Sequence, residues 1–225
     1  MKVYNIAIDG PAGAGKSTVA KLAAKRLGFI YVDTGAMYRA MGLFIKEKGI
    51  LPQDEQAVSD VCGQADITIT YENGEQQVYL NGNNVNGRIR TEEAGKLASV
   101  TSAYKAVRAR LVELQKELAA NNSVIMDGRD IGTKVLPKAD LKIYLVADSL
   151  KRAERRYKEL TAKGIVCDIN EIQKDIIARD EADMSRKESP LCKAEDAYLL
   201  DTSNLTADEA AESIIAMFNQ RCNKS

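Results

Sequence analysis

The chain has 225 residues with 32 basic and 32 acidic side chains, no histidine, and a hydrophobic fraction of 45%. This composition is typical of a globular protein with a sizeable core and argues against intrinsic disorder. A net charge of zero argues against a general nucleic-acid or membrane-surface binder. The absence of histidine excludes Ser-His-Asp and Cys-His catalytic sites, as well as zinc sites with a histidine ligand.

The sequence also indicates where the protein resides. No stretch approaches 18 consecutive apolar residues, and the start MKVYNIAIDG holds Asn5 and Asp9 where a signal peptide would be apolar. We therefore expect a cytoplasmic protein. The four cysteines form no CxxC pair, which favours reduced structural thiols over a zinc site.

The first part of the chain predicts a strand–helix–strand–helix order. An apolar run over 2–9 predicts a buried strand, and the apolar spacing over 16–27 predicts a helix that ends at Gly28. A second strand is expected over 29–32 and a second helix over 36–48. This alternation is typical of a parallel sheet in an α/β protein.

The pattern changes near residue 64. Polar and apolar residues alternate over 66–71, and Asn73-Gly74 and Asn81-Gly82 are hairpin turn signals on either side of 77–80. We therefore expect a small antiparallel meander over 64–90, inserted as an appendage.

A long helical stretch follows the meander. Thr91 is a candidate N-cap for a helix over 92–120, which would break near Ala103-Tyr104. Apolar runs over 123–127 and 141–146 then predict two further strands.

The last part of the chain returns to the α/β pattern. Ser149 and Asn170 are candidate N-caps for helices that end near Lys163 and Glu181. A final strand is expected over 197–200. The capping box over 206–209 then opens a C-terminal helix.

The strongest motif is the run 10–17, GPAGAGKS, which matches the phosphate-binding pattern GxxxxGK(S/T) and lies between a predicted strand and a predicted helix. Its glycines let backbone N–H groups turn inward around phosphates, and the helix N-terminus faces the same anion. Lys16 would contact the β- and γ-phosphates, and Ser17 would hold Mg²⁺. The sequence therefore predicts a site for a nucleoside triphosphate with Mg²⁺.

Other residues indicate what happens to the γ-phosphate. A GTPase switch would need an NKxD motif, and the sequence has none. A kinase needs a second pocket and arginines that neutralise phosphoryl charge. Arg39 follows the second predicted strand and Arg129 follows a later one, and the carboxyl ends of these strands would converge on one cleft. The arginines therefore favour a small-molecule kinase.

A further basic cluster lies at 150–158, LKRAERRYK, with five basic residues and one acid, and the segment 179–186 adds two arginines. One interpretation is an ordinary exposed helix face. The other is a mobile lid, over about 150–190, whose arginines close over the transferring phosphate and exclude water.

At this point the chain resembles the bacterial cytidylate kinases, which are nucleoside monophosphate kinases. The resemblance covers essentially the whole chain and rests on IDGPAGAGKST, DTGAMYRA, GRIRTEE, DGRDIGTKVLPKA and RDEADMSR. It implies a P-loop NTPase fold of the α/β class, with a five-stranded parallel sheet flanked by helices. It also implies a core kinase domain over 1–63 and 121–225, a monophosphate-binding insert over 64–120, and a helical lid.

The resemblance further implies reversible phosphoryl transfer from Mg-ATP to CMP or dCMP in pyrimidine metabolism, by a monomer without nucleic-acid or membrane partners. The residues that it implies for the donor are Gly10, Pro11, Ala12, Gly13, Ala14, Gly15, Lys16, Ser17 and Thr18, with Arg152 and Arg156 from the lid. Those that it implies for the acceptor are Thr34, Arg39, Ser99, Arg108, Arg129, Asp130, Arg179, Asp183 and Arg186.

Roles for these residues follow from the same resemblance. Arginines 39, 129 and 186 would clamp the acceptor phosphate and, with Lys16, be catalytic; Ser99, Arg108 and Asp130 would read cytosine; Asp183 and Arg179 would hold the ribose. Cytosine offers an amine donor and ring acceptors, which suit a carboxylate and a guanidinium, whereas uracil would place an acceptor against the carboxylate. Alternatives for the base contacts are Thr101, Ser102 and Arg110.

Two rival functions stay open at this stage. A kinase for another acceptor, such as UMP, shikimate or dephospho-coenzyme A, would show no activity with CMP. A nucleotide-dependent switch would bind ATP tightly, hydrolyse it slowly and show no dependence on an acceptor. The several arginines and the missing NKxD motif argue against the switch.

Overall fold

The computed structural model describes residues 2–72 and 74–222. The strands are β1 (Asn5–Asp9), β2 (Ile30–Asp33), β3 (Ile67–Glu72), β4 (Glu75–Leu80), β5 (Asn83–Asn84), β6 (Val124–Gly128), β7 (Leu141–Val146) and β8 (Tyr198–Asp201). The helices are α1 (Lys16–Leu27), α2 (Thr34–Glu47), α3 (Glu55–Cys62), α4 (Glu92–Thr101), α5 (Lys105–Asn121), α6 (Ser149–Ala162), α7 (Ile169–Ser185), α8 (Ala207–Cys222) and a π-helical turn, η1 (Ile131–Val135).

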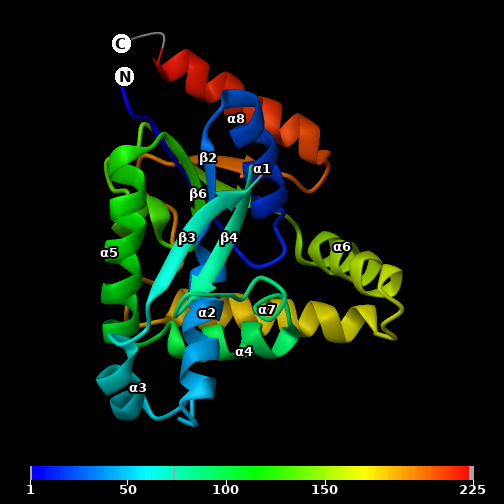
Figure 1. The fold of residues 1–225 in the computed structure, drawn as a ribbon. Helices are drawn as coiled ribbons and strands as arrows, with labels where there is room; N and C mark the ends of the chain where they lie inside the picture. The colour runs from blue at the N-terminus through cyan, green and yellow to red at the C-terminus, as the bar shows by residue number, and fades with distance from the viewer. Residues whose placement is uncertain (1, 73, 223–225) are drawn as a thin grey trace. The chain divides into compact units, whose positions relative to one another are not determined.

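The strands form two sheets (Figure 1). The larger has the order β2-β6-β1-β7-β8, and the smaller is antiparallel with the order β3-β4-β5. The expected α/β fold, with a five-stranded parallel sheet and a small antiparallel insert, is therefore confirmed.

The chain divides into two compact units. Unit 1 comprises Met1–Phe29 and Ser123–Ser225, and unit 2 comprises Ile30–Asn122. The second division falls close to the predicted boundary at 120/121, whereas the first groups β2, α2 and α3 with the insert. The functional division into core, lid and insert stays a prediction.

In unit 1, β1 is the central strand. It pairs in parallel with β6 on one side and with β7 on the other. Ile6, Ala7 and Ile8 are fully buried, as expected of a parallel strand that is covered on both faces. Helices α1 and α8 lie side by side (Figure 1). The phosphate-binding loop departs from the carboxyl end of β1 and leads directly into α1.

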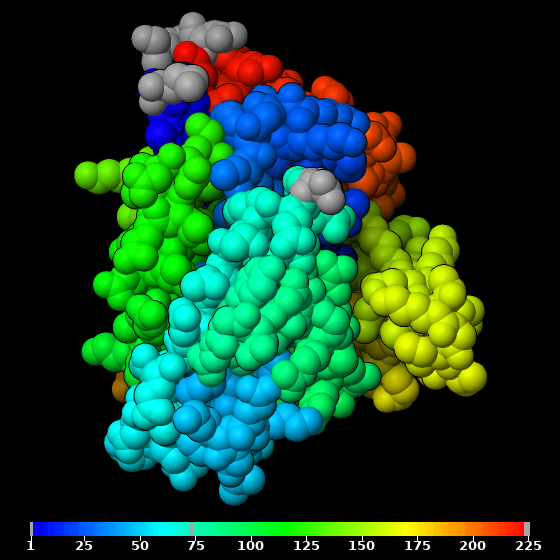
Figure 2. Space-filling model, viewed as in Figure 1, coloured from blue at the N-terminus to red at the C-terminus, as the bar shows by residue number. Residues whose placement is uncertain are grey.

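Unit 2 has its own hydrophobic core. Met37, Met41 and Phe44 of α2 pack in one cluster with Val78 and Leu80 of the insert. The outer surface of the β3–β4 hairpin, cyan to blue-green, faces the viewer in Figure 2. The insert therefore contributes inward side chains to this core, as the polar–apolar alternation predicted.

The hairpin turn at Asn81-Gly82 is confirmed. Asn81 has φ +50° and Gly82 has φ +77°, the left-handed backbone that a tight turn between β4 and β5 requires. Of the other predicted turn, Asn73 lies outside the described residues.

Several helix boundaries differ from expectation. Asp148 rather than Ser149 caps α6, because its carboxylate accepts from Leu150 N at 2.9 Å. Asp168 rather than Asn170 caps α7, which ends at Ser185 instead of near Glu181. In both cases the earlier aspartate satisfies the first N–H groups of the helix.

Two elements were not predicted from the sequence. Helix α3 has only eight residues, of which Val58 and Cys62 are buried, so its apolar pattern is short. The turn η1 lies in the DGRDIGTKVLPKA segment, where we expected no helix. The break between α4 and α5 and the capping box before α8 are confirmed, the latter by Thr206 Oγ1 accepting from Glu209 N at 3.2 Å. None of the described helices is long and apolar enough to cross a membrane.

Candidate functional site

The phosphate-binding loop, Gly10–Ser17, has a backbone that requires glycine at particular positions. Gly10 has φ +149°, and a Cβ there would lie 2.0 Å from the carbonyl oxygen of Leu145 in β7. Gly15 has φ +90° and is the N-cap of α1. These two positions let the loop pass close to the sheet and deliver its N–H groups to the start of the helix.

Lys16 is buried at the base of this loop. Its Nζ donates to the carbonyl oxygen of Pro11 at 2.8 Å. Burial lowers the pKa of Lys16 to about 7, and the nearby Arg129 charge acts in the same direction. A bound triphosphate would favour the charged ammonium again, because opposite charges stabilise each other.

Ser17, the next residue, points to a carboxylate. Its Oγ donates to Asp127 Oδ2 at 2.7 Å, and Asp127 lies buried in β6. A hydroxyl and a carboxylate are oxygen ligands of the kind that Mg²⁺ prefers, with the remaining positions left for phosphate oxygens and water. Among the described residues no group of three or more acidic or Cys side chains forms a metal site. Ser17 and Asp127 would suit a metal ion that arrives with its nucleotide, because they supply oxygen ligands.

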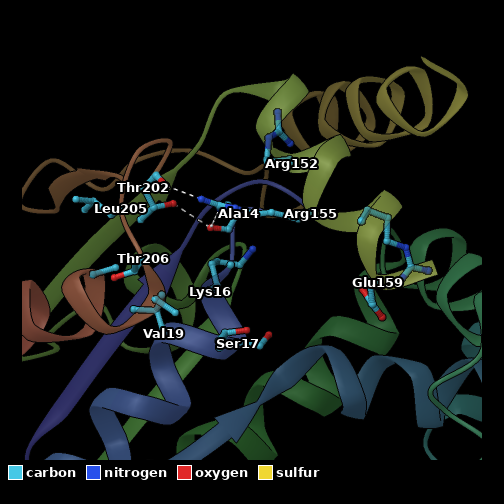
Figure 3. Close-up of a pocket in the computed structure, with 16 residues that line it drawn as sticks. Ala14, Lys16, Ser17, Val19, Arg152, Arg155, Glu159, Thr202, Leu205 and Thr206 are labelled. Carbon is cyan, nitrogen blue, oxygen red and sulfur yellow. Dashed lines mark hydrogen bonds and ion pairs between the residues drawn. The ribbon is translucent and has the colours of Figure 1, made fainter. Parts of the chain in front are cut away.

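A cavity of about 480 Å³ opens beside the loop in unit 1 (Figure 3). Its walls come from α1, α6 and the segment between β8 and α8, and include Thr202, Leu205 and Thr206. Arg155 of α6 donates to the carbonyl oxygen of Thr202, and Thr202 Oγ1 donates to the carbonyl oxygen of Ala14 at 3.2 Å. Arg155 belongs to the basic run 150–158, but its position in that run did not single it out as a site residue.

The two predicted lid arginines differ in their surroundings. Arg156 lines the cavity and pairs with Glu159 at 2.9 Å. Arg152 is buried, and it donates to the carbonyl oxygens of Ala147 and Ala12, each at 2.9 Å. Arg152 thus holds the phosphate-binding loop itself, and its expected contact with the donor stays a prediction.

Arg129 and Arg186, both predicted for the acceptor, meet at the carboxylate of Asp183. We call these three residues the Asp183 cluster. Arg129 Nε donates to Asp183 Oδ2 at 2.7 Å, and Arg186 donates to Oδ1 at 2.8 Å. Burial alone would raise the pKa of Asp183, but the two guanidinium groups outweigh it and hold this pKa below its ordinary value. Arg179 is exposed, and its charge lowers the same pKa.

Asp9 supports the loop that carries Arg129 and Asp130. Its two carboxylate oxygens accept from the backbone N–H groups of Ile131 and Gly132, both at 2.7 Å. Burial raises the pKa of Asp9 to about 6, against the effect of these hydrogen bonds. Asp130 itself is buried. The sequence showed an acid and a glycine, Asp9-Gly10, at the end of the first strand. It did not show that Asp9 binds the backbone of the segment after Asp130.

The predicted phosphate-binding residues of unit 2 lie at the start of α2. Asp33 caps this helix by accepting from Ala36 N, and it pairs with Arg39 at 2.9 Å. Thr34 is buried. The side-chain amide of Gln76, from the insert, bonds both the N–H and the carbonyl oxygen of Asp33. The insert thus braces the turn that presents Arg39.

The candidate base-reading residues of unit 2 lie on α4 and α5. Ser99 is exposed. Arg108 is buried, donates to the carbonyl oxygen of Ser102 at 3.0 Å and lies over the ring of Tyr38. Its alternative, Arg110, is exposed near Glu113. Arg108 is thus buried and Arg110 is not, and a contact of either residue with the base stays a prediction.

A strand–loop–helix unit that binds phosphate, next to a basic cluster on a parallel sheet, defines a P-loop phosphotransferase. A sequence profile described as cytidylate kinase matches residues 6–220, and the chain belongs to this family. It is 47% identical to the cytidylate kinase of Caldicellulosiruptor bescii over 97% of this chain and 96% of that protein.

Further comparisons agree with this assignment. The chain is 49% identical to the cytidylate kinase of Lactobacillus gasseri, over 97% of this chain and 95% of that protein. Among solved structures, an uncharacterised protein from Eubacterium ventriosum aligns with a TM-score of 0.53 at 12% identity, covering 96% of this chain and 98% of that one. The structural match concerns the fold alone.

Proposed function

We propose that this protein transfers the γ-phosphoryl group of ATP to CMP, giving ADP and CDP, and that it also accepts dCMP. The observation that carries this proposal is that the phosphate-binding loop lies beside the segment with Arg129, because Asp9, directly before the loop, accepts from the N–H groups of Ile131 and Gly132 at 2.7 Å. A triphosphate loop beside arginines for a second phosphate suits a kinase with a phosphorylated acceptor. Membership of the cytidylate kinase family supports CMP as that acceptor.

The reaction needs positioning more than proton transfer. A phosphate oxygen of CMP attacks the γ-phosphorus, and the bond to the β–γ bridging oxygen breaks with its electron pair leaving on ADP. The attacking oxygen is already anionic, so no side chain has to remove a proton. Lys16 and the loop N–H groups would hold the donor, and Arg39, Arg129 and Arg186 would hold the acceptor phosphate.

The donor would bind with Mg²⁺. Ser17 would supply a hydroxyl ligand, and Asp127 would orient that hydroxyl or accept a hydrogen bond from a metal-bound water. When bound, the ion neutralises charge on the β- and γ-phosphates.

For the acceptor nucleoside, we propose one set of contacts to the base and one to the sugar. Asp130, Arg108 and Ser99 would read the cytosine edge, and Asp183 with Arg179 would hold the ribose. The burial of Asp130 and Arg108 supports these roles, because a buried polar group discriminates strongly against a mismatched partner.

We also propose that the protein acts as a monomer in the cytoplasm. The balanced charge of the chain supports a role on small nucleotides rather than on nucleic acid or a membrane. Light scattering of the purified protein, which should give the mass of one chain, tests the oligomeric state.

The test of the function is ADP production from Mg-ATP with CMP, dCMP, UMP, AMP, GMP or no acceptor in one series. We expect strong stimulation by CMP and dCMP, weak stimulation by UMP, and no reaction without acceptor. Equal rates with CMP and UMP would retain the kinase but reject the Asp130 contact. A rate that no acceptor changes would reject the kinase and favour a nucleotide-dependent switch.

A further inference from the structure

We propose that Arg152 and Asp180 are positioning residues that fix the phosphate-binding loop in its donor-binding shape by holding the backbone of Ala12. Asp180 Oδ1 accepts from the N–H of Ala12 at 3.0 Å. Arg152, from the neighbouring helix α6, donates to the carbonyl oxygen of the same residue at 2.9 Å. Both polar groups of Ala12 are thus occupied, one by an acceptor and the other by a donor.

The two side chains also bind each other, and the whole group is shielded from water. Arg152 pairs with Asp180 Oδ2, and its Nε donates to the carbonyl oxygen of Ala147. Ala12, Arg152 and Asp180 are each only 7% exposed. Hydrogen bonds of this kind are strong in a low-dielectric interior, and removing one partner leaves a buried charge unpaired. These contacts therefore hold the backbone of Ala12 in one conformation.

The loop rests directly on the helices that carry this pair. A Cβ at Gly13 would lie 3.4 Å from Arg152 Cβ and 3.8 Å from Ile176 Cδ1 of α7. The residue after Ala12 is therefore packed against both α6 and α7, and a change in either helix reaches the loop without an intervening element.

The orientation of Ala12 matters to an anion. The loop binds phosphate because its N–H groups point inward, and a carbonyl that turned toward the phosphates would repel them. Arg152 holds the carbonyl oxygen of Ala12 toward α6, and Asp180 of α7 accepts from the N–H of Ala12. The pair therefore acts on the donor through the loop. This inference rests on the proposed donor site, and it assigns Arg152 a role different from direct contact with ATP.

The test measures ATP and CMP binding separately, by titration calorimetry with Mg²⁺ present, in the wild type, Asp180→Ala and Asp180→Asn. We expect Asp180→Ala to weaken ATP binding by about 10–100-fold, as the loss of a buried charged hydrogen bond implies, with CMP binding within about twofold of the wild type. Asp180→Asn keeps an acceptor for the Ala12 N–H and should recover most of that loss. It also serves if the alanine variant does not fold.

A charge-reversed double variant separates this role from that of an ordinary ion pair. Arg152→Asp with Asp180→Arg retains opposite charges but offers the wrong group to both the N–H and the carbonyl of Ala12. We therefore expect no recovery of ATP affinity. The control is Glu171→Gln, which removes an exposed ion pair with Lys174 on the same helix and should change neither affinity.

The proposal would be overturned if Asp180→Ala and Asp180→Asn both bound ATP as tightly as the wild type. It would also be overturned if a destabilised variant lost ATP and CMP affinity equally, or if the charge-reversed double variant recovered ATP affinity. Failure of the wild type to bind ATP at all would instead reject the proposed function, so the two failures are distinguishable.

Discussion

Two residues at the junction of β1 and α1 show how burial tunes the charges of this site. Asp9 and Lys16 are both buried, and their pKa values move toward neutrality from opposite sides, to about 6 and about 7. The chain has no histidine that could titrate in this range. The pH response of the protein near neutrality therefore depends on groups such as Asp9 and Lys16, whose ordinary pKa values are 3.8 and 10.5.

Asp9 makes a prediction about stability. Its pKa is about 6 in the folded protein and near 3.8 when unfolded, so the folded state binds the proton more tightly. This tighter proton binding contributes up to about 3 kcal/mol to the free energy of unfolding. The contribution is fully present below pH 3.8 and is lost as the pH rises through 6. We expect the free energy of unfolding of the wild type, relative to Asp9→Asn, to increase as the pH falls from 7 to about 4.

Urea unfolding at several pH values measures this difference. Asp175→Asn, on the exposed face of α7, is the control and should leave the pH dependence as in the wild type. A wild-type protein that loses stability relative to Asp9→Asn over the same range would contradict the sign of the shift.

Asp130 makes a prediction about base selectivity. We expect Asp130→Ala to lower kcat/KM for CMP by about 10–100-fold while changing that for UMP much less, because only cytosine donates to the carboxylate. The measurement is the ratio of kcat/KM for the two acceptors at fixed Mg-ATP. An unchanged ratio would show that Asp130 does not read the base.

At the scale of elements, close packing of α2 against α4 organises unit 2. A Cβ at Gly42 of α2 would lie 2.8 Å from Leu97 Cβ and 3.1 Å from the backbone nitrogen of Ala98. Real Cβ atoms do not approach that closely, so the two helices depend on glycine at this crossing. The contact holds the second half of α2 against α4.

A pair of glycine substitutions tests this packing. We expect Gly42→Ala to destabilise the protein by about 1–2 kcal/mol, because the steric cost exceeds the gain in helix propensity. A Cβ added at Gly95 of α4 would meet no atom within 4 Å, so Gly95→Ala should stabilise by about 0.5–1 kcal/mol. Urea unfolding compares the two, and a stabilising Gly42→Ala would contradict the proposed contact.

Elements with strong periodicity or a specific motif were predictable from sequence. The run GPAGAGKS fixes a strand, a loop and a helix because only that arrangement presents N–H groups to phosphate. The hairpin was predictable from Asn81-Gly82, whose observed backbone angles are those that the dipeptide favours. The family motifs singled out Arg129 and Arg186, and the structure brings these two side chains together at Asp183, while their contact with the acceptor stays a prediction.

Partners in three dimensions were not predictable. Asp180 and Glu181 are adjacent acids on one helix, and nothing in the local sequence shows that the first is buried against the phosphate-binding loop and the second is exposed. Arg152 and Arg156 belong to the same basic run and both line the cavity, yet Arg152 is buried and donates to the phosphate-binding loop, whereas Arg156 pairs with Glu159. The apolar spacing of a helix shows its core-facing side, but which distant group a polar side chain binds depends on tertiary packing.

At the scale of the whole molecule, unit 2 contains a hydrophobic cluster whose buried members all come from that unit. The cluster around Met37, Met41 and Phe44 draws its buried members only from residues between 36 and 111. All of these lie within unit 2, Ile30–Asn122. A segment of this size with its own core is in the range that folds independently.

We therefore expect the fragment 30–122, produced alone, to keep helical circular dichroism and a cooperative thermal transition, at a lower melting temperature than the whole protein. The matched control is the same fragment with Phe44→Ala, which should lose the transition because it removes a large buried side chain. A non-cooperative melt of the unsubstituted fragment would show that its core depends on the rest of the chain.

The arrangement of α7 has a consequence for protein engineering. Asp180 and Asp183 are one helical turn apart, so one inserted residue upstream in α7 would rotate both carboxylates by about 100° and detach the loop and the arginines together. The segment between α6 and α7 precedes the helix, so its length does not set the rotation of these carboxylates, and Val166 there is fully exposed. Peptide tags or reporter sequences are therefore best inserted at that turn, whereas α7 itself has a fixed length.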